Sequence, residues 1–350
     1  MRNRIVGQDL AEITAEDLPW ERLQGARVLV TGASGILASY MVETLLYLNE
    51  TRRMGIRILA AQRNRKKAQA RFAHAVACPA LTLLQQDVCA PFSIDGSLDY
   101  IIHAAGQSSP KFYGSDPIGT IEGHILGTRN VLALAREKGV KGMLQLSSCD
   151  SYGERFAADD PTCLAENFVG RLDPLSDRGC YSMGKAAAEA LCHAYALGAK
   201  LPVKIVRIAH TYAPLMPLDD GHVFADFVGN ALRGEDIALT SDGSAQRPFL
   251  YIADAIRAYF RVLFLGTPGE TYNVAAEENT SILELAHLVA SLAPQGTPRV
   301  VFKQELPAGY VPAPKKTICI SIAKLKALGY RRRYSLREGM RRTIESYRSE

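Results

Sequence analysis

A tyrosine and a lysine four positions apart are the residues of this sequence best suited to acid–base chemistry. They belong to the stretch Tyr181-Ser-Met-Gly-Lys185, which opens a predicted helix over residues 181–197. Because positions i and i+4 share one face of a helix, the phenol and the ammonium group can converge on one substrate oxygen. A nearby cation favours phenolate and lowers the pKa of a phenol, so Tyr181 is a candidate general base near neutral pH.

Two polar clusters follow predicted strands that precede this helix. Ser147-Ser148-Cys149-Asp150 ends one strand, so a hydroxyl and a carboxylate reach the same edge of the sheet as the tyrosine. The Cys149 thiol either donates a proton or is a small buried apolar group. The strand before it ends in His103-Ala104-Ala105-Gly106, whose small side chains leave room for a flat ring.

A glycine-containing turn near the N-terminus suggests that the flat ring beside residues 103–106 belongs to a dinucleotide. The stretch Thr31-Gly-Ala-Ser-Gly-Ile-Leu-Ala-Ser39 stands between an apolar run and a segment with apolar residues at helical spacing. In the order strand, turn and helix, Gly32 permits the tight turn, and Gly35 lets the backbone approach a pyrophosphate that the helix amides face. The pattern therefore predicts a dinucleotide site, with nicotinamide at the alanines, and an ordinary βα turn is the alternative.

The residues at the end of the second predicted strand bear on whether the dinucleotide is NAD or NADP. An acid there selects a free ribose 2′-hydroxyl, but the sequence reads Leu59-Ala-Ala-Gln62-Arg63-Asn64. Arg63 either meets a 2′-phosphate, which favours NADP, or stacks on adenine or is solvated. Asp87 either accepts a hydrogen bond from the adenine amino group or caps a helix.

Alternating strands and helices position these residues. We expect strands at 28–31, 56–61, 81–84, 100–104, 143–147 and 203–208, and helices at 35–50, 118–138 and 181–197 between them. This order predicts an α/β fold, a Rossmann-type doubly wound parallel sheet with a smaller C-terminal α/β substrate lobe. The predicted divisions are an N-terminal leader (1–25), a dinucleotide-binding domain (26–212, to which 253–265 returns) and a substrate lobe (213–350).

Composition narrows the class of protein. The formal charge of +5 over 350 residues is too small to argue for nucleic acid. No run of 18 apolar residues is present, and the N-terminus lacks a signal-peptide pattern, so we expect no membrane association. The seven cysteines include no C-x-x-C pair, which favours free thiols in a reducing cytoplasm over disulfides or a zinc site. No metal site is predicted.

Taken together, these motifs resemble those of the extended short-chain dehydrogenase/reductases that act on nucleotide sugars. The resemblance is greatest to UDP-glucuronate decarboxylases and dTDP-glucose 4,6-dehydratases, and it runs from about Arg27 to Arg342. Beyond the motifs above, it rests on residues 127–131, 147–153, 170–181, 207–214, 218–224 and 242–254. It implies an enzyme, a lyase or isomerase of carbohydrate biosynthesis, that binds NAD, with NADP left open by Arg63. It also implies that residues 213–350 form a nucleotide-sugar-binding lobe.

The resemblance also implies a mechanism. Tyr181, helped by Lys185 and Ser148, takes the proton from the C4 hydroxyl of a UDP- or dTDP-linked hexose while hydride passes to the cofactor. The 4-keto sugar then feeds dehydration, decarboxylation or epimerisation, with Asp150 and Cys149 where the dehydratases have an acid–base pair. The helices at 118–138 and 181–197 match those through which the family forms homodimers. The alternatives are an NADP-dependent carbonyl reductase and a sugar-nucleotide-binding protein with weakened catalysis.

Two sets of binding residues follow from matching positions. The implied cofactor-binding residues are Gly32, Ser34, Gly35, Ile36, Arg63, Asn64, Asp87, Val88, His103, Ala104, Ala105, Tyr181 and Lys185. The implied substrate-binding residues are Ser108, His124, Arg178, His210, Val223 and Arg247. The planar Arg247 guanidinium suits phosphate oxygens, a surface ion pair being its alternative. His124 and His210 replace asparagines of the family, and His222 replaces an arginine of the decarboxylases, so an unusual substrate or weakened catalysis is expected.

Overall fold

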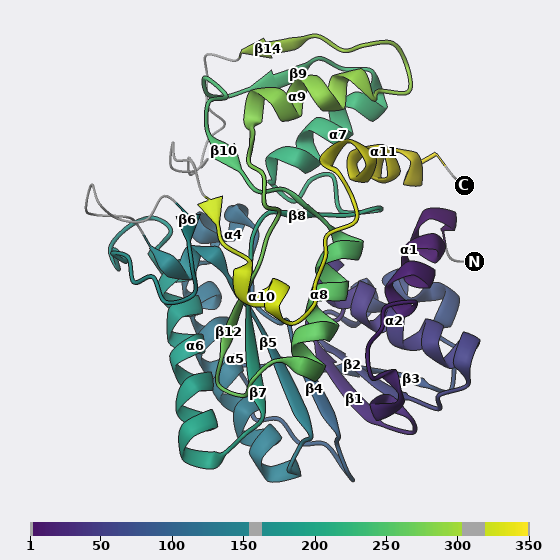
Figure 1. Cartoon of the computed structure of the whole chain (residues 1–350), viewed down its shortest axis with the longest axis vertical. Coiled ribbons are helices and arrows are strands. Elements are labelled where there is room, and N and C mark those ends of the chain that lie inside the picture. Colours follow the sequence, from purple (N-terminus) through teal and green to yellow (C-terminus); the bar gives the residue numbers. More distant parts are fainter. Residues whose placement is uncertain (1–2, 154–162, 303–318, 349–350) are drawn as a thin grey trace.

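A parallel sheet of seven strands forms the centre of the molecule (Figure 1). The computed structural model describes residues 3–153, 163–302 and 319–348. All neighbouring strands pair in parallel, in the order β12-β7-β5-β4-β1-β2-β3. Their bounds are β1 Arg27–Thr31, β2 Arg57–Gln62, β3 Leu81–Gln85, β4 Tyr100–His103, β5 Gly142–Ser148, β7 Val203–Ile208 and β12 Thr271–Val274. The predicted doubly wound sheet is confirmed, and β12 is an additional edge strand.

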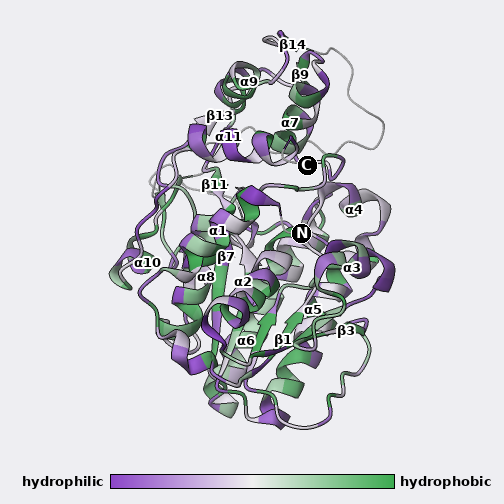
Figure 2. Cartoon of the chain, turned by 90° about the vertical axis from the view of Figure 1, so that its right-hand side faces the viewer, coloured by the Kyte–Doolittle hydropathy of each residue, from purple (hydrophilic) through white to green (hydrophobic). Residues whose placement is uncertain are grey.

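Helices cover both faces of the sheet. The three predicted helices are confirmed as α2 (Ile36–Arg52), α5 (Pro117–Lys138) and α6 (Gly179–Ala199). Strand residues that alternate along the chain divide between two apolar clusters: Leu29 and Ile101 pack with α5 and α6, whereas Val28 and Ile102 pack with α2 and α8 (Ile252–Leu265). Strands buried on both faces read as continuous apolar runs, and β1 and β7 are hydrophobic in Figure 2.

The N-terminal segment packs into the body of the protein. It forms α1 (Arg4–Thr14) and the 3₁₀ turn η1 (Trp20–Leu23). Asp9 of α1 is fully buried, and its carboxylate accepts hydrogen bonds from Tyr40 of α2, from Tyr251 and from Arg342 of α11 (Leu336–Ser346). The two ends of the described chain consequently lie near each other (Figure 1).

Short elements from the second half of the chain gather beyond the carboxyl ends of the strands (Figure 1). Helices α7 (Val223–Arg233) and α9 (Ile282–Ser291) pack on the paired strands β9 (Ile237–Leu239) and β14 (Val300–Phe302). The remaining elements are α3 Arg65–Arg71, η2 Ala73–Ala75, α4 Pro110–Ser115, η3 Cys149–Tyr152, β6 Cys163–Leu164, β8 Thr211–Tyr212, β10 Gln246–Arg247, β11 Leu250–Tyr251, β13 Thr280–Ser281, β15 Cys319–Ile320 and α10 Ala323–Ala327. Helix α8 and strand β12 return to the sheet, and the domain boundaries given above remain a prediction.

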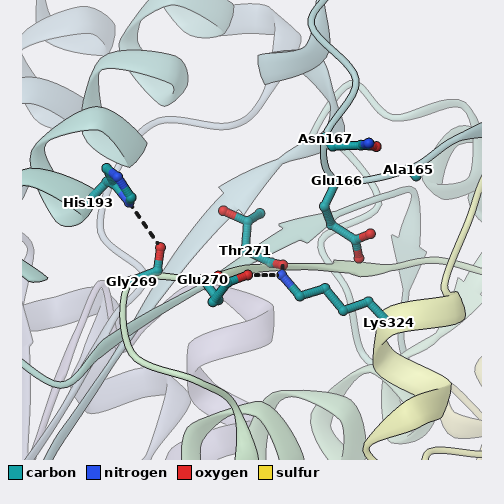
Figure 3. A pocket seen from close by; sticks show the side chains of 8 residues that line it. All are labelled: Ala165, Glu166, Asn167, His193, Gly269, Glu270, Thr271 and Lys324. Carbon is teal, nitrogen blue, oxygen red and sulfur yellow. Dashed lines mark hydrogen bonds and ion pairs between the residues drawn. The ribbon is translucent and has the colours of Figure 1, made fainter.

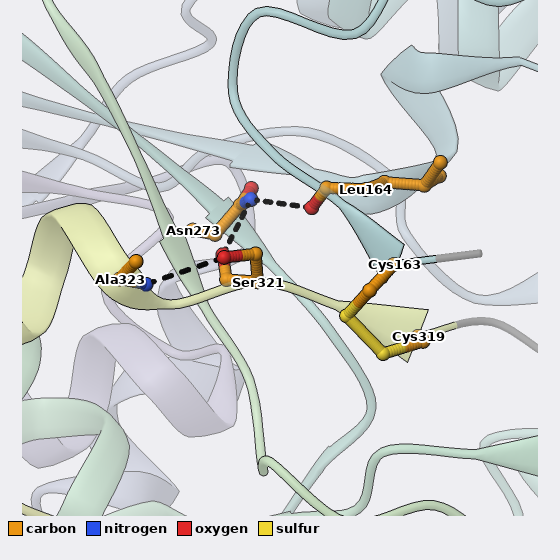
Figure 4. Close-up of a disulfide and its surroundings, with 6 residues drawn as sticks. All are labelled: Cys163, Leu164, Asn273, Cys319, Ser321 and Ala323. Carbon is orange, nitrogen blue, oxygen red and sulfur yellow. Dashed lines mark hydrogen bonds between the residues drawn. A yellow bond between two sulfur atoms is a disulfide. The ribbon is translucent and has the colours of Figure 1, made fainter. Parts of the chain in front are cut away.

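One expectation from the cysteines is wrong. Cys163 and Cys319 form a disulfide between the paired strands β6 and β15, although they lie 156 residues apart in the sequence (Figure 4). Sequence spacing carried no sign of this pairing because the fold alone brings the two strands together. Beside the disulfide, the Asn273 side-chain amide donates to the carbonyls of Leu164 and Ser321 and so ties both strands to β12. Within the described residues, the other five cysteines are free.

None of the helices in the described ranges combines the length and the apolar character that crossing a bilayer requires. The predicted cytoplasmic location remains a prediction.

Candidate active site

The glycine turn occupies the point where the strand order reverses, between β4 and β2 on either side of β1. Gly32 has a positive φ of 66°, and a Cβ atom there would lie 2.8 Å from the backbone of Ala105 at the end of β4. Gly35 precedes α2 without a side-chain cap, and the first turn of α2 contains no acidic residue. The amides from Ile36 onward are therefore available to an anion, and this arrangement fits the diphosphate of a dinucleotide.

The residues predicted at the adenosine end lie at the same edge of the sheet. Gln62 ends β2, and Arg63 follows it with an exposed side chain. The Asn64 side chain caps α3 by accepting from Lys67 N at 3.0 Å. Asp87 does not cap a helix, since its Oδ1 accepts from Cys89 N at 2.9 Å within a turn, and its contact with adenine stays a prediction.

Val88 packs against α5. A Cβ atom on Gly127 of that helix would lie 2.7 Å from Val88 Cγ2, so the glycine is required for this close approach. The loop after β3, which carries both Asp87 and Val88, is thereby held beside the carboxyl end of β4.

Strand β5 delivers the predicted serine, cysteine and aspartate to the edge of the sheet. Ser148 is its last residue, and the Ser148 Oγ accepts from Asp150 N at 3.1 Å in the turn η3. The turn is anchored by Glu189 of α6, whose Oε1 accepts from the hydroxyls of Ser147 and Ser151 and which pairs with Arg207 of β7 at 2.7 Å. The sequence analysis missed this buried network, although Glu189 lies one helical turn after Lys185 and so shares its face.

Tyr181 and Lys185 are both buried, each with 7% of its surface exposed. Lys185 Nζ donates to the Leu146 carbonyl at 2.8 Å and lies 5.8 Å from the centre of the Tyr181 ring. Burial lowers the pKa of Lys185 to about 8, partly offset by Glu189, so the side chain is still mostly cationic at pH 7.

The expectation that the pKa of Tyr181 is lowered is wrong. Burial raises the pKa of Tyr181, and the negative charge of Asp150 raises it further, whereas a hydrogen bond with Ser148 acts in the opposite direction. Desolvation of the phenolate is the largest effect, and the cationic Lys185, 5.8 Å from the ring centre, does not compensate for it.

Arg178 connects the aspartate to a tyrosine that the sequence analysis missed. Arg178 Nη2 and Asp150 Oδ2 form an ion pair at 2.9 Å. The Arg178 guanidinium also lies 5.0 Å from the centre of the Tyr113 ring, and that ring stacks on Tyr181 at 5.0 Å. Tyr113 belongs to the short helix α4, and its hydroxyl donates to the carbonyl of the predicted substrate residue Ser108. No spacing pattern marked Tyr113, because its position depends on tertiary contacts.

Two buried histidines near the site, His103 of β4 and His124 of α5, stay neutral. Burial, and then the charge of Lys185, lowers the pKa of His103 to about 3 and that of His124 well below its usual range. His103 hydrogen-bonds Thr31 Oγ1 through Nδ1 at 2.6 Å. His124 Nε2 lies 3.2 Å from the Gln107 carbonyl, and the imidazole meets the Tyr181 ring edge-on at 5.3 Å. Because a carbonyl only accepts, the Nε2 of His124 carries the proton.

The remaining predicted substrate residues come from the second half of the chain. Arg247 is buried, with 4% of its surface exposed, and its Nη1 donates to the Gln246 carbonyl at 2.8 Å. His210 Nδ1 is inaccessible to solvent and has no hydrogen-bond partner among the described residues. Burial and the charge of Arg247 lower the pKa of His210, whereas the charge of Asp150 raises it. The same two charges act in the same directions on the pKa of Cys149. Burial, followed by Asp150, raises the pKa of the Cys149 thiol to about 12, so this thiol is neutral.

Val223 begins α7, and the turn before it meets the loop that carries Ser108. Ser109 Oγ and Lys111 Nζ donate to the carbonyls of Asp220 and Asp219. The second half of the chain thus closes over the edge of the sheet next to α4.

A separate cavity of about 400 Å³ contains none of the predicted site residues (Figure 3). It lies beside β12, where Lys324 pairs with Glu270 and His193 Nδ1 bonds the Gly269 carbonyl. The lining is completed by Ala165, Glu166, Asn167 and Thr271. Across the ranges that the structure covers, no group of three or more histidine, cysteine or acidic side chains is arranged to hold a metal ion.

The glycine turn at the switch point, with the Tyr181–Lys185 pair and Ser148 at the neighbouring strand end, defines a dinucleotide-dependent enzyme of the extended short-chain dehydrogenase/reductase class. The chain belongs to the NAD dependent epimerase/dehydratase family, whose sequence model matches residues 28–275. It is therefore an enzyme whose cofactor is NAD.

Curated relatives match almost the whole chain. UDP-glucuronic acid decarboxylase 3 of Arabidopsis thaliana is 30% identical over 326 residues, which cover 92% of this chain and 89% of the relative. UDP-glucuronic acid decarboxylase 1 of Xenopus tropicalis is 29% identical, with 93% and 72% covered.

Solved structures show the same fold. The dTDP-glucose 4,6-dehydratase of Bacillus anthracis, in complex with NAD, is 20% identical with a TM-score of 0.71, over 92% of this chain and 96% of that one. The UDP-glucuronic acid 4-epimerase of Bacillus cereus, in complex with UDP-glucuronic acid and NAD, is 22% identical with a TM-score of 0.75, over 92% and 99%.

Proposed function

We propose that this enzyme modifies a UDP- or dTDP-linked hexose through transient oxidation at C4. The observation that carries the proposal is the convergence of Tyr181, Ser148 and Lys185 at one edge of the sheet, with the Asp150–Arg178 ion pair beside them. The relatives named above act on nucleotide sugars, and their similarity extends over almost the whole chain.

The first step is removal of the C4 hydroxyl proton by Tyr181. The glycine turn and the first amides of α2 would hold NAD, which would supply a reversible hydride acceptor for C4. The Tyr181 phenolate is the base in this step, and the cationic Lys185 and a hydrogen bond with Ser148 stabilise it against part of the desolvation that burial imposes. The neutral imidazole of His124 packs against the phenol ring and fixes its orientation.

The second step uses the acidity that a C4 ketone gives to the neighbouring carbons. Asp150 can exchange a proton at C5 once Arg178 binds another anion: as a base in dehydration or epimerisation, or by passing a solvent proton to C5 after decarboxylation. Arg178 in turn suits a C6 carboxylate, which leaves as carbon dioxide while its bonding electrons pass to the C4 ketone as an enolate. Dehydration needs an acid for the C6 hydroxyl, and the Cys149 thiol, with its pKa of about 12, is a poor one. We therefore favour a uronic acid substrate over a neutral hexose.

A second candidate is a carbonyl reductase that consumes NADP stoichiometrically, which the exposed Arg63 favours. Incubation with UDP-glucuronate, UDP-N-acetylglucosamine and dTDP-glucose distinguishes the two, with products identified by mass spectrometry. Loss of carbon dioxide or water from one of them, without added cofactor being consumed, supports the proposal, and Tyr181→Phe abolishes it. If none of them changes while NADPH is consumed with a simple carbonyl compound, the reductase is correct.

We also propose a homodimer formed through α5 and α6, which pack on each other along one side of the sheet. The exposed Leu197 lies on α6 and the exposed Ile118 on α5. Light scattering that shows only monomer at micromolar concentration would exclude this assembly.

A further inference from the structure

We propose that Gln62 and Arg63 form a subsite for the 2′-phosphate of NADP(H), so that the protein binds NADP at least as tightly as NAD. In dinucleotide sites, an acid at the end of the second strand accepts from the ribose 2′-hydroxyl, whereas an arginine accommodates the 2′-phosphate. The inference concerns only the adenosine end of the site and does not depend on which sugar the enzyme modifies.

Gln62 stands where the ribose is bound. It is the last residue of β2, and the end of that strand lies against the glycine turn, because Ala33 N donates to the Ala61 carbonyl at 3.2 Å. Only 5% of Gln62 is exposed, and its Oε1 has no hydrogen-bond partner among the described residues. Its Nε2 reaches the Leu84 carbonyl only at 3.5 Å. A buried amide with an unmet acceptor is unfavourable, and rotation of the Gln62 side chain toward a ribose hydroxyl that donates to it removes this cost.

Replacing an acid by Gln62 also changes the charge of the subsite. A carboxylate at this position repels a phosphate, whereas a neutral amide does not. The end of β2 therefore tolerates the 2′-phosphate without losing a hydrogen bond to the ribose.

Arg63 supplies the charge that a 2′-phosphate needs. Its side chain is exposed, and within the described ranges it takes part in no hydrogen bond or ion pair. Arg63 directly follows the last residue of β2, and its positive charge acts on Cys89 in the loop after β3 and on Asp116 before α5. The Asp116 carboxylate is already bound to Gln107 Nε2 and Gly119 N, so Arg63 stays available to an incoming anion. Its planar fork matches phosphate oxygens.

The test is isothermal titration of the full-length protein with NAD⁺ and with NADP⁺, without sugar nucleotide, after bound dinucleotide has been removed. We expect NADP⁺ to bind at least as tightly as NAD⁺. Arg63→Ala is expected to weaken NADP⁺ binding about tenfold or more, because a charge-assisted bond to phosphate is lost, and NAD⁺ binding less than about threefold. Arg57→Ala, at the opposite end of β2, is the matched control and leaves both affinities unchanged. Gln62→Asp is expected to shift the preference toward NAD⁺.

Two results overturn the inference: NADP⁺ that binds more than about tenfold more weakly than NAD⁺ to the unaltered protein, or Arg63→Ala that weakens both dinucleotides equally. Thermal melting of each variant verifies that it is folded, and the exposed Arg63 remains informative if the buried Gln62→Asp variant does not fold. Sugar turnover is not a readout, so the result stands whether or not the proposed reaction is correct.

Discussion

Replacing Asp150 by Asn is expected to strengthen binding of an acidic sugar nucleotide while it lowers turnover. In the structure, the Asp150 carboxylate is ion-paired with the Arg178 guanidinium, with 2.9 Å between Oδ2 and Nη2. A uronic acid substrate competes for that same guanidinium. Removing the negative charge of Asp150 therefore frees Arg178 for the substrate, but it also removes the carboxyl group that passes a proton to C5 in the second step.

The magnitude follows from the exposure of the pair. The side chains of Arg178 and Asp150 are 25% and 27% exposed, so solvent screens their attraction substantially. An ion pair in this setting contributes about 1 kcal/mol, which corresponds to roughly fivefold tighter binding of UDP-glucuronate by Asp150→Asn. Arg178→Ala loses a charge-assisted contact of about 1.5–3 kcal/mol and weakens the same ligand roughly 10- to 100-fold.

Calorimetry on the NAD-loaded enzyme measures these changes directly. UDP-glucuronate and UDP-glucose are titrated into the unaltered protein, Asp150→Asn and Arg178→Ala, and turnover is followed by mass spectrometry. Asp173→Asn, a change in the loop that leads to α6, is the charge-matched control, and it leaves both affinities unchanged. The reasoning is refuted if Asp150→Asn weakens UDP-glucuronate, or if it strengthens both sugar nucleotides equally.

Three further changes test the packing around the site. Burial, and then the charge of Arg22, lowers the pKa of Lys204 from 10.5 to about 8, so this lysine destabilises the folded state below pH 8 and less so as the pH rises toward 10.5. Lys204→Met is therefore expected to raise the free energy of unfolding by about 1–3 kcal/mol at pH 7 and by little at pH 10.5, as measured by denaturant unfolding. Replacing Cys163 and Cys319 by serine is expected to cost about 2–4 kcal/mol under oxidising conditions, with no further loss on adding a reductant. A Cβ atom in Gly106→Ala would lie 2.3 Å from the His124 ring at a φ of 143°, so turnover is expected to fall on the order of a hundredfold; an unchanged rate would show that the imidazole position does not matter.

Local sequence patterns predict most of the sheet. Strands buried on both faces are continuous apolar runs, and the helices between them carry apolar residues at helical spacing, so six of the seven strands are evident. Sequence patterns do not predict strand β12, because its four residues include the polar Asn273 and because its place at the edge is set by pairing with β7. The Cys163–Cys319 disulfide escapes for a similar reason, since only the fold brings β6 and β15 together.

The candidate site divides in the same way. Tyr181, Lys185 and Ser148 lie at one edge of the sheet, as the order of strands and helices implies. Tertiary packing decides the rest: Tyr113 stacks on Tyr181 from a short helix without a sequence pattern, and Arg178 pairs with an acid of another segment. The pKa of Tyr181 shows the limit most clearly, because burial, which a motif does not reveal, outweighs the neighbouring cation.

Turnover of UDP-glucuronate that carries deuterium at C4 tests the central claim most directly. Oxidation at C4 predicts a slower reaction than with hydrogen, a product that retains deuterium at C4 because the hydride is returned to the same carbon, and no product from Tyr181→Phe. Product formed at an undiminished rate by Tyr181→Phe, or with the C4 deuterium exchanged for solvent hydrogen, would contradict the account.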